Sequence, residues 1–188
     1  MGNEKKILEI AKEAIEAKLE NREPKIGKIP AELKEKQGCF VTLTINGQLH
    51  GCIGHILPVQ ELYKDLIENA CSAAFSDPRF MPLTKAEFEK VKIEVSLLDL
   101  PRKLNYKTTD ELLNYLAKNK PGVIIKKGLN QATFLPQVWE ELPQAEDFLS
   151  HLCLKAGLPA DEWLATHSLS EEWTQGLDFE TYGVKKIL

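Results

Sequence analysis

A cysteine between two glycines, with histidines nearby on both sides, is the part of this sequence whose residue types could do chemistry. Glycine leaves the main chain uncovered, so another molecule can approach the backbone at Gly51 and Gly54. Imidazoles are the side chains best suited to take a proton from a thiol near neutral pH. Cys52 is therefore a candidate nucleophile or redox thiol, with His50 or His55 as its base.

Two other interpretations of the same residues stay open. Most cysteines in strands are small packing residues, so Cys52 could be a buried hydrophobe. A thiol and two imidazoles, joined by His151 and Cys153, could also bind a metal ion. Their spacing matches no zinc signature, and the sequence therefore predicts no metal site.

An Asp-Pro-Arg turn between aromatic residues provides a second chemical group. Pro78 stiffens the turn, so the Asp77 carboxylate and the Arg79 guanidinium should lie near each other. They form either a substrate-binding pair or a salt bridge that locks the loop. Farther along the chain, Glu140 follows Trp139 and is a candidate general base, although such residues are more often solvated.

Composition narrows the class of protein. The chain has 188 residues, of which 43% are hydrophobic and 28% charged, as in an ordinary globular protein of one domain. The net charge is −4 and no basic stripe is present, so we expect neither nucleic acid nor a membrane as a partner. With no signal-like or membrane-spanning run, we expect a cytoplasmic location and reduced cysteines.

The candidate thiol should lie in a β-hairpin. Residues 39–45 alternate like a strand, Asn46-Gly47 is a strong two-residue turn signal, and a second strand should run from 48 to 54. In an uninterrupted hairpin, Leu43 faces His50 and Val41 faces Cys52. Directly opposed residues share a sheet face, which predicts His50 and Cys52 beside Val41 and Leu43.

The remaining pattern is that of hairpins separated by helices. This order favours an α+β fold with a mostly antiparallel sheet flanked by helices. A capping box at Thr84-Glu87 begins a short helix. The periodicity predicts helices over 4–20, 59–75, 109–119 and 144–156, strands over 91–98, 122–126 and 131–135, and a final strand over 177–184.

Six stretches of the sequence, 38–43, 49–54, 73–83, 93–96, 132–139 and 155–159, follow the order of motifs in one family. Together they resemble the AMMECR domain family, also called AmmeMemoRadiSam system protein A. The resemblance implies a single AMMECR-like domain over 1–188, with a larger subdomain and a smaller one from parts of 100–135 and the C-terminal region. It also implies a cleft near the Gly-Cys-Ile-Gly motif, which would bind an unidentified small molecule, and association with Memo-like and radical SAM proteins. The resemblance implies neither an established reaction nor a cofactor.

The resemblance also bears on single residues. The family motif usually carries arginine where this sequence has His50, and histidine supplies a positive charge only while protonated. Two functions follow as hypotheses: thiol-dependent catalysis or redox chemistry at Cys52, or a non-catalytic binding or adaptor module in which Cys52 is structural. The substrate-binding candidates implied by the matching blocks are Gly51, Gly54, Asp77, Arg79, Thr133 and Gln137.

Overall fold

The chain divides into two compact units. The computed structural model describes residues 2–167 and 176–188. One unit holds the residues up to Leu100 together with Lys185–Leu188, and the other comprises Pro101–Val184. The candidates Cys52, Asp77 and Arg79 all fall in the first unit.

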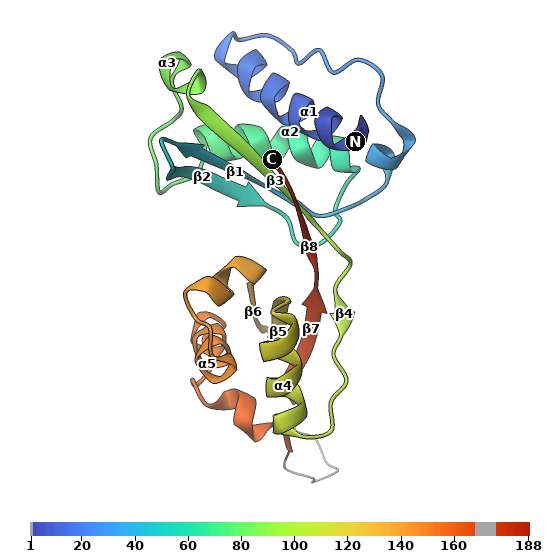
Figure 1. Cartoon of the computed structure of the whole chain (residues 1–188), viewed down its shortest axis with the longest axis vertical. Coiled ribbons are helices and arrows are strands. Elements are labelled where there is room, and N and C mark those ends of the chain that lie inside the picture. The colour runs from blue at the N-terminus through green and yellow to red at the C-terminus, as the bar shows by residue number, and fades with distance from the viewer. Residues whose placement is uncertain (1, 168–175) are drawn as a thin grey trace. The chain divides into compact units, whose positions relative to one another are not determined.

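A four-stranded antiparallel sheet forms the first unit, with helices α1 (Gly2–Leu19) and α2 (Leu62–Phe75) against one face (Figure 1). Strand β1 pairs with β2 on one edge and with β3 on the other. This arrangement places the predicted hairpin at one side of the sheet. The strands follow the order β2 (Gln48–Gly54), β1 (Cys39–Ile45), β3 (Val91–Leu98) and β8 (Val184–Ile187).

Alternating side chains of the strands and the apolar stripes of both helices build the core of this unit. Val41, Leu43 and Val95 point toward the helices and are fully buried. On the helices, Ile15 and Leu66 are equally buried. Each such side chain contributes about 1.5–3 kcal/mol to folding, so this face of the sheet is fixed by packing.

Helix α2 begins later than its periodicity predicts. The expected start was residue 59, but the first helical residue is Leu62. The Leu62 amide donates to the Glu35 carbonyl, and Glu61 forms an isolated antiparallel bridge with Lys36. These contacts hold the preceding residues outside the helix. Two short elements complete the unit, η1 (Ala31–Lys34) and α3 (Lys85–Phe88), and α3 carries the predicted capping box.

The second unit is another antiparallel sheet with helices. Trp139 stacks on Phe148, with ring centroids 3.8 Å apart, at the centre of its core. The expected final strand is in fact two strands, one in each sheet, because the chain passes from the second unit back to the first. The short strand β4 has no clear signal in the sequence. The elements are β4 (Arg102–Lys103), α4 (Thr109–Asn119), β5 (Gly122–Lys127), β6 (Asn130–Phe134), η2 (Pro136–Glu140), α5 (Ala145–Lys155), η3 (Glu162–His167) and β7 (Asp178–Tyr182).

Two antiparallel sheets with flanking helices confirm the predicted α+β class. Within residues 2–167 and 176–188, no helix has the length and hydrophobicity needed to cross a membrane.

Candidate functional site

The hairpin turn forms as predicted, but the strand after it carries a bulge. Asn46 and Gly47 have φ of 51° and 80°, as the two-residue turn requires, and Ile45 opposes Gln48. Beyond Leu49 the register shifts, because His50 is an extra residue on β2. The predicted pairing of Cys52 with Val41 is therefore wrong.

Because the register slips by one residue, Cys52 lies opposite Thr42. Its side chain shares the Thr42 face, away from α1 and α2, and does not join Val41 and Leu43 in the core. Gly51 turns toward α2 instead, where a Cβ would stand 2.0 Å from the Ala73 carbonyl oxygen. The space that Gly51 leaves beside the main chain is thus taken by helix α2 of the same chain and not by another molecule.

Three hydrogen bonds surround Cys52. The Thr42 hydroxyl donates to the half-buried sulfur, with Oγ1 and Sγ 3.2 Å apart. The Cys52 amide donates to Asp77 Oδ2 at 2.9 Å, and the Cys52 carbonyl accepts from Arg79 Nη2 at 3.4 Å. The main chain on both sides of the thiol is therefore held by the loop that follows α2.

Asp77 anchors that loop. The residue is 4% exposed, and its carboxylate accepts from the Arg79 side chain at Nε (2.9 Å) and Nη2 (2.7 Å), besides the Cys52 amide. The paired guanidinium and these amide donors hold the pKa of Asp77 well below its ordinary value, and the carboxylate raises the pKa of Arg79. Asp77 is therefore saturated, whereas the Arg79 side chain stays 55% exposed.

Polar side chains form a row across the first sheet at the level of the thiol. Thr42 opposes Cys52 on one side and Glu94 on the other. Glu94 in turn forms an ion pair with Lys186 of β8 at 3.5 Å. A thiol, a hydroxyl, a carboxylate and an ammonium group thus follow one another over four strands, on the face that the helices leave free.

The two histidines near Cys52 have other neighbours. His50, in the bulge, stacks on Phe80 with ring centroids 6.1 Å apart, and its buried Nε2 has no hydrogen-bond partner among the described residues. His55 binds Asp65 of α2, with Nδ1 and Oδ1 2.7 Å apart. In the described part of the chain, neither imidazole hydrogen-bonds to Cys52.

Asp65 centres a polar cluster under α2 that sequence reasoning missed. It is 1% exposed and accepts from the Cys39 thiol at 3.2 Å and the Asn69 amide at 2.9 Å, besides contacting His55. Burial, and then the negative charge of Asp65, raises the pKa of Cys39 well above its ordinary value. Only the helical position of Asp65, among apolar residues, could have indicated a buried carboxylate.

The remaining candidates lie in the second unit. Thr133 donates to the Val123 carbonyl at 2.9 Å and contacts the Tyr182 hydroxyl at 2.9 Å. Burial raises the pKa of Tyr182 to about 12. Gln137 has a buried Oε1 without a hydrogen-bond partner in the described residues, and Glu140 is exposed. No group of three potential metal-ligating side chains occurs among the residues described here.

The chain is similar to proteins of one family. The AMMECR1 family model matches residues 8–175. Protein NEQ441 of Nanoarchaeum equitans is 44% identical over 84% of this chain and 89% of its own length. Protein Mbar_A1807 of Methanosarcina barkeri is 41% identical, over 84% of this chain and 80% of that protein.

A solved structure shares the fold. The crystal structure of uncharacterized protein PH0010 from Pyrococcus horikoshii superimposes with a TM-score of 0.78 at 32% identity. The match covers 96% of this chain and 88% of that protein.

Proposed function

The chain belongs to the AMMECR1 family, and we propose that its first unit binds a small anionic molecule at the Cys52 thiol. The observation that carries this proposal is the hydrogen bond from Thr42 Oγ1 to Cys52 Sγ on the face away from the helices. A thiol packed only as a hydrophobe would be expected on the opposite face, among the core side chains.

Two hydrogen-bond donors lie close to the Cys52 thiol, the Thr42 hydroxyl and the Arg79 guanidinium. A hydroxyl that donates to sulfur stabilises a thiolate, which is the reactive form of cysteine. Arg79 adds a permanent positive charge next to the Cys52 main chain. Its described bonds to Asp77 and Cys52 use Nε, Nη2 and the main-chain N–H. The Nη1 group therefore remains for a ligand carboxylate or phosphate.

Asp77 supports this site by positioning and does not meet the ligand itself. Its carboxylate oxygens already accept from Arg79 and from the Cys52 amide. Arg79 is thereby held in one orientation although its side chain is largely exposed. A preorganised guanidinium loses less conformational freedom on binding an anion than a mobile one.

Two disulfide reagents test the proposal. Thiolate attack on 5,5′-dithiobis(2-nitrobenzoate), an anionic disulfide, breaks its S–S bond, forms a mixed disulfide with Cys52 and releases a coloured thiolate. The neutral reagent 4,4′-dithiodipyridine reacts in the same way. We expect Arg79→Gln to slow the anionic reagent about 5-fold, in line with the loss of one exposed charge interaction. The neutral reagent should change less than 2-fold.

Cys52→Ser provides the blank for both reagents, and Arg79→Lys retains the charge without the planar fork. An equal loss of rate with both reagents in Arg79→Gln would show that Arg79 only maintains the local structure. Absence of a Cys52 reaction in the native protein would refute the proposal.

A non-catalytic binding or adaptor module is the second candidate function. Two contacts favour it: Gly51 packs against Ala73, and the Asp77 carboxylate is fully engaged by hydrogen bonds within the chain. Both contacts explain these residue types by the needs of the fold, without a ligand. We propose Memo-like and radical SAM proteins as the partners in this case, on the strength of the family resemblance. Co-purification of such a partner with wild type and equally with Cys52→Ser would favour the adaptor; dependence on Cys52 would favour the thiol site.

A further inference from the structure

A carboxylate lies two strands away from Cys52, on the same face of the first sheet. Thr42 stands between them, because it opposes Cys52 of β2 on one side and Glu94 of β3 on the other. Directly opposed residues share a sheet face, so all three side chains lie on the face away from α1 and α2. Neighbouring strands are about 4.8 Å apart, which puts the main chain of Glu94 about 10 Å from that of Cys52.

Arg79 lies on the other side of the thiol. Strand β2 is at the edge of its sheet, and both main-chain groups of Cys52 hydrogen-bond to the loop after α2, the amide to Asp77 and the carbonyl to Arg79. In an antiparallel pair, the two main-chain groups of one residue point to the same side, so this loop lies along the outer edge of β2. The Arg79 guanidinium therefore marks one end of a polar row and the Glu94 carboxylate the other, with the thiol between them.

The carboxylate of Glu94 is largely unused by the chain. Its side chain is 25% exposed and accepts no hydrogen bond from any described residue. Its one ion pair within the described chain is with Lys186, over 3.5 Å, and the Lys186 side chain is 45% exposed. Exposed ion pairs of this kind contribute little, so Lys186 does not prevent Glu94 from binding another cation. A mostly buried carboxylate usually has hydrogen-bond donors around it, and here a ligand can supply them.

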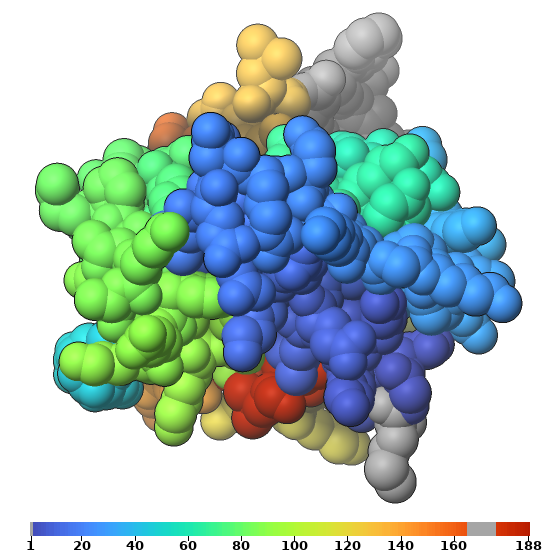
Figure 2. All heavy atoms as spheres, turned by 90° about the horizontal axis from the view of Figure 1, so that it is seen from above, coloured from blue at the N-terminus to red at the C-terminus, as the bar shows by residue number. Residues whose placement is uncertain are grey.

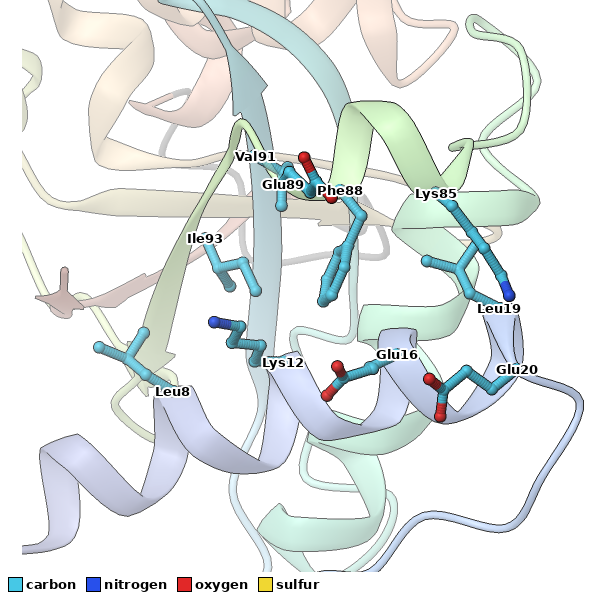
Figure 3. Close-up of a pocket in the computed structure, with 10 residues that line it drawn as sticks. All are labelled: Leu8, Lys12, Glu16, Leu19, Glu20, Lys85, Phe88, Glu89, Val91 and Ile93. Atoms are coloured by element: carbon cyan, nitrogen blue, oxygen red, sulfur yellow. The ribbon is translucent and has the colours of Figure 1, made fainter.

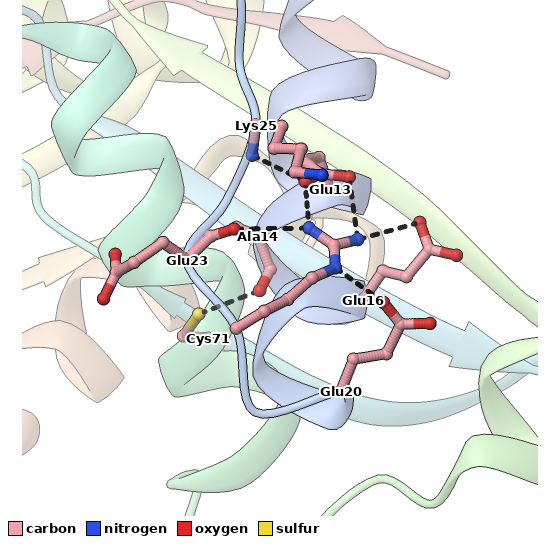
Figure 4. A network of polar contacts seen from close by, with 8 residues as sticks. Glu13, Ala14, Glu16, Glu20, Glu23, Lys25 and Cys71 are labelled. Atoms are coloured by element: carbon pink, nitrogen blue, oxygen red, sulfur yellow. Dashed lines mark hydrogen bonds and ion pairs between the residues drawn. The ribbon is translucent and has the colours of Figure 1, made fainter.

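The helix side of the first unit carries charge in a different pattern. Figure 2 shows the blue residues of α1 across this side. A groove of about 530 Å³ lies there between α1, α3 and the start of β3, and its charged lining comprises Lys12, Glu16, Glu20, Lys85 and Glu89 (Figure 3). Glu16 also lies 4.0 Å from Arg22, which Glu13 and Glu20 hold as well (Figure 4). Both signs of charge are mixed along this groove, so Glu16 is a suitable comparison for Glu94.

We propose that Glu94 binds an ammonium group of the ligand whose acidic group meets Arg79, so that the Cys52 site selects a small zwitterion. This ligand class rests on the proposed function, because it takes Cys52 and Arg79 as parts of one binding site. Opposite charges at the two ends of the row orient a zwitterion in one direction only. Since the row is at least about 10 Å long, the ligand has the length of about three extended peptide residues.

Two disulfides of equal length test Glu94, with Cys52 as the reporter. The Cys52 thiolate attacks one sulfur of bis(4-aminobutyl) disulfide or bis(4-hydroxybutyl) disulfide, forms a mixed disulfide and expels the other half as a thiolate. Mass spectrometry of the Cys52 peptide gives the rate. We expect Glu94→Gln to slow the ammonium reagent about 4-fold and the hydroxyl reagent less than 2-fold. Lys186→Gln should speed up the ammonium reagent about 2-fold, because the carboxylate loses a competing cation.

Glu16→Gln removes the same charge on the helix side and should leave both rates within about 2-fold of wild type, because salt screens charges across the sheet. Equal effects of Glu16→Gln and Glu94→Gln would show that only net charge acts, and would overturn the inference. So would an equal loss with both reagents in Glu94→Gln, since Glu94 would then only maintain the sheet. No reaction of Cys52 with either reagent would refute the proposed function as well, whereas a reaction indifferent to Glu94 refutes the zwitterion alone.

Triglycine, a zwitterion of the expected length, tests the ligand class directly. At millimolar concentration it should protect Cys52 from iodoacetamide about 3-fold better than acetyl-triglycine, which lacks the ammonium group, or triglycinamide, which lacks the carboxylate. In Glu94→Gln, triglycine and acetyl-triglycine should protect equally. In Arg79→Gln, triglycine and triglycinamide should protect equally. Equal protection of the wild type by all three compounds, or none by triglycine, would overturn the inference.

Discussion

Thr42 on β1 donates a hydrogen bond to the sulfur of Cys52 on β2, over 3.2 Å. This contact exists because the bulge at His50 moves the register by one residue. Without the bulge, Cys52 would oppose Val41 and point into the core. A single inserted residue therefore decides whether the thiol points into the core or lies on the opposite face of the sheet.

Gly51 should tolerate no side chain. In Gly51→Ala, the new Cβ would lie 2.0 Å from the Ala73 carbonyl oxygen, so strand and helix must separate. We expect a loss of about 3 kcal/mol in the free energy of unfolding, measured by urea denaturation. Gly2→Ala is the control, because a Cβ there meets nothing within 4 Å. Equal stability of both variants would contradict the close packing of α2 on β2.

Asp77 should make stability depend on pH in the acid range. Its pKa is lowered in the folded protein, mainly by Arg79, so its charged form stabilises the fold above the ordinary pKa of about 3.9. That stabilisation is lost as the pH falls through the lower folded pKa. We expect Asp77→Asn to cost about 2 kcal/mol at neutral pH.

The difference in stability between the two proteins should begin to shrink as the pH falls below about 3.9, the ordinary pKa of an aspartate, and should vanish only below the lowered pKa of folded Asp77. Urea denaturation of wild type and Asp77→Asn from neutral to acid pH measures this difference. A difference that stays constant across the acid range would show that the carboxylate charge is not what stabilises the loop.

His50 should be replaceable by an apolar ring. Its Nε2 is buried without a hydrogen-bond partner in the described residues, and its ring stacks on Phe80. His50→Phe keeps the stack and removes the unpaired nitrogen, which should raise the free energy of unfolding by about 1 kcal/mol. His50→Ala, which loses the stack as well, should be destabilised. A destabilised His50→Phe would indicate that the nitrogen has a partner in solution.

The strands and the turn near the site could be predicted from residues close together in the sequence. The sheet face on which the Cys52 side chain lies could not. The Asn46-Gly47 turn and the alternation of 39–45 depend on neighbours in the sequence, and both were confirmed. The register shift at His50 turns Gly51 toward Ala73 on α2, a close contact between residues that are more than twenty positions apart in the sequence. Register beyond a bulge is therefore a tertiary property.

The chemical partners were also only partly predictable. The pairing of Asp77 with Arg79 followed from their closeness in one stiff turn. Thr42 has no distinguishing sequence signal, because its hydroxyl matters only through the strand opposite. His55 was predicted as a base for Cys52 because the two residues are close in the sequence. In the structure His55 lies just after β2 and hydrogen-bonds to Asp65.

Alkylation of the native protein with iodoacetamide, followed by peptide mapping of all four cysteines, tests the central claim most directly. Burial raises the pKa of Cys39, Cys71 and Cys153, so these thiols should react slowly until the protein unfolds. We predict that Cys52 is labelled first and that Thr42→Val slows its labelling. Labelling of Cys52 no faster than of the other three, or unaffected by Thr42→Val, would contradict a functional thiol at this site.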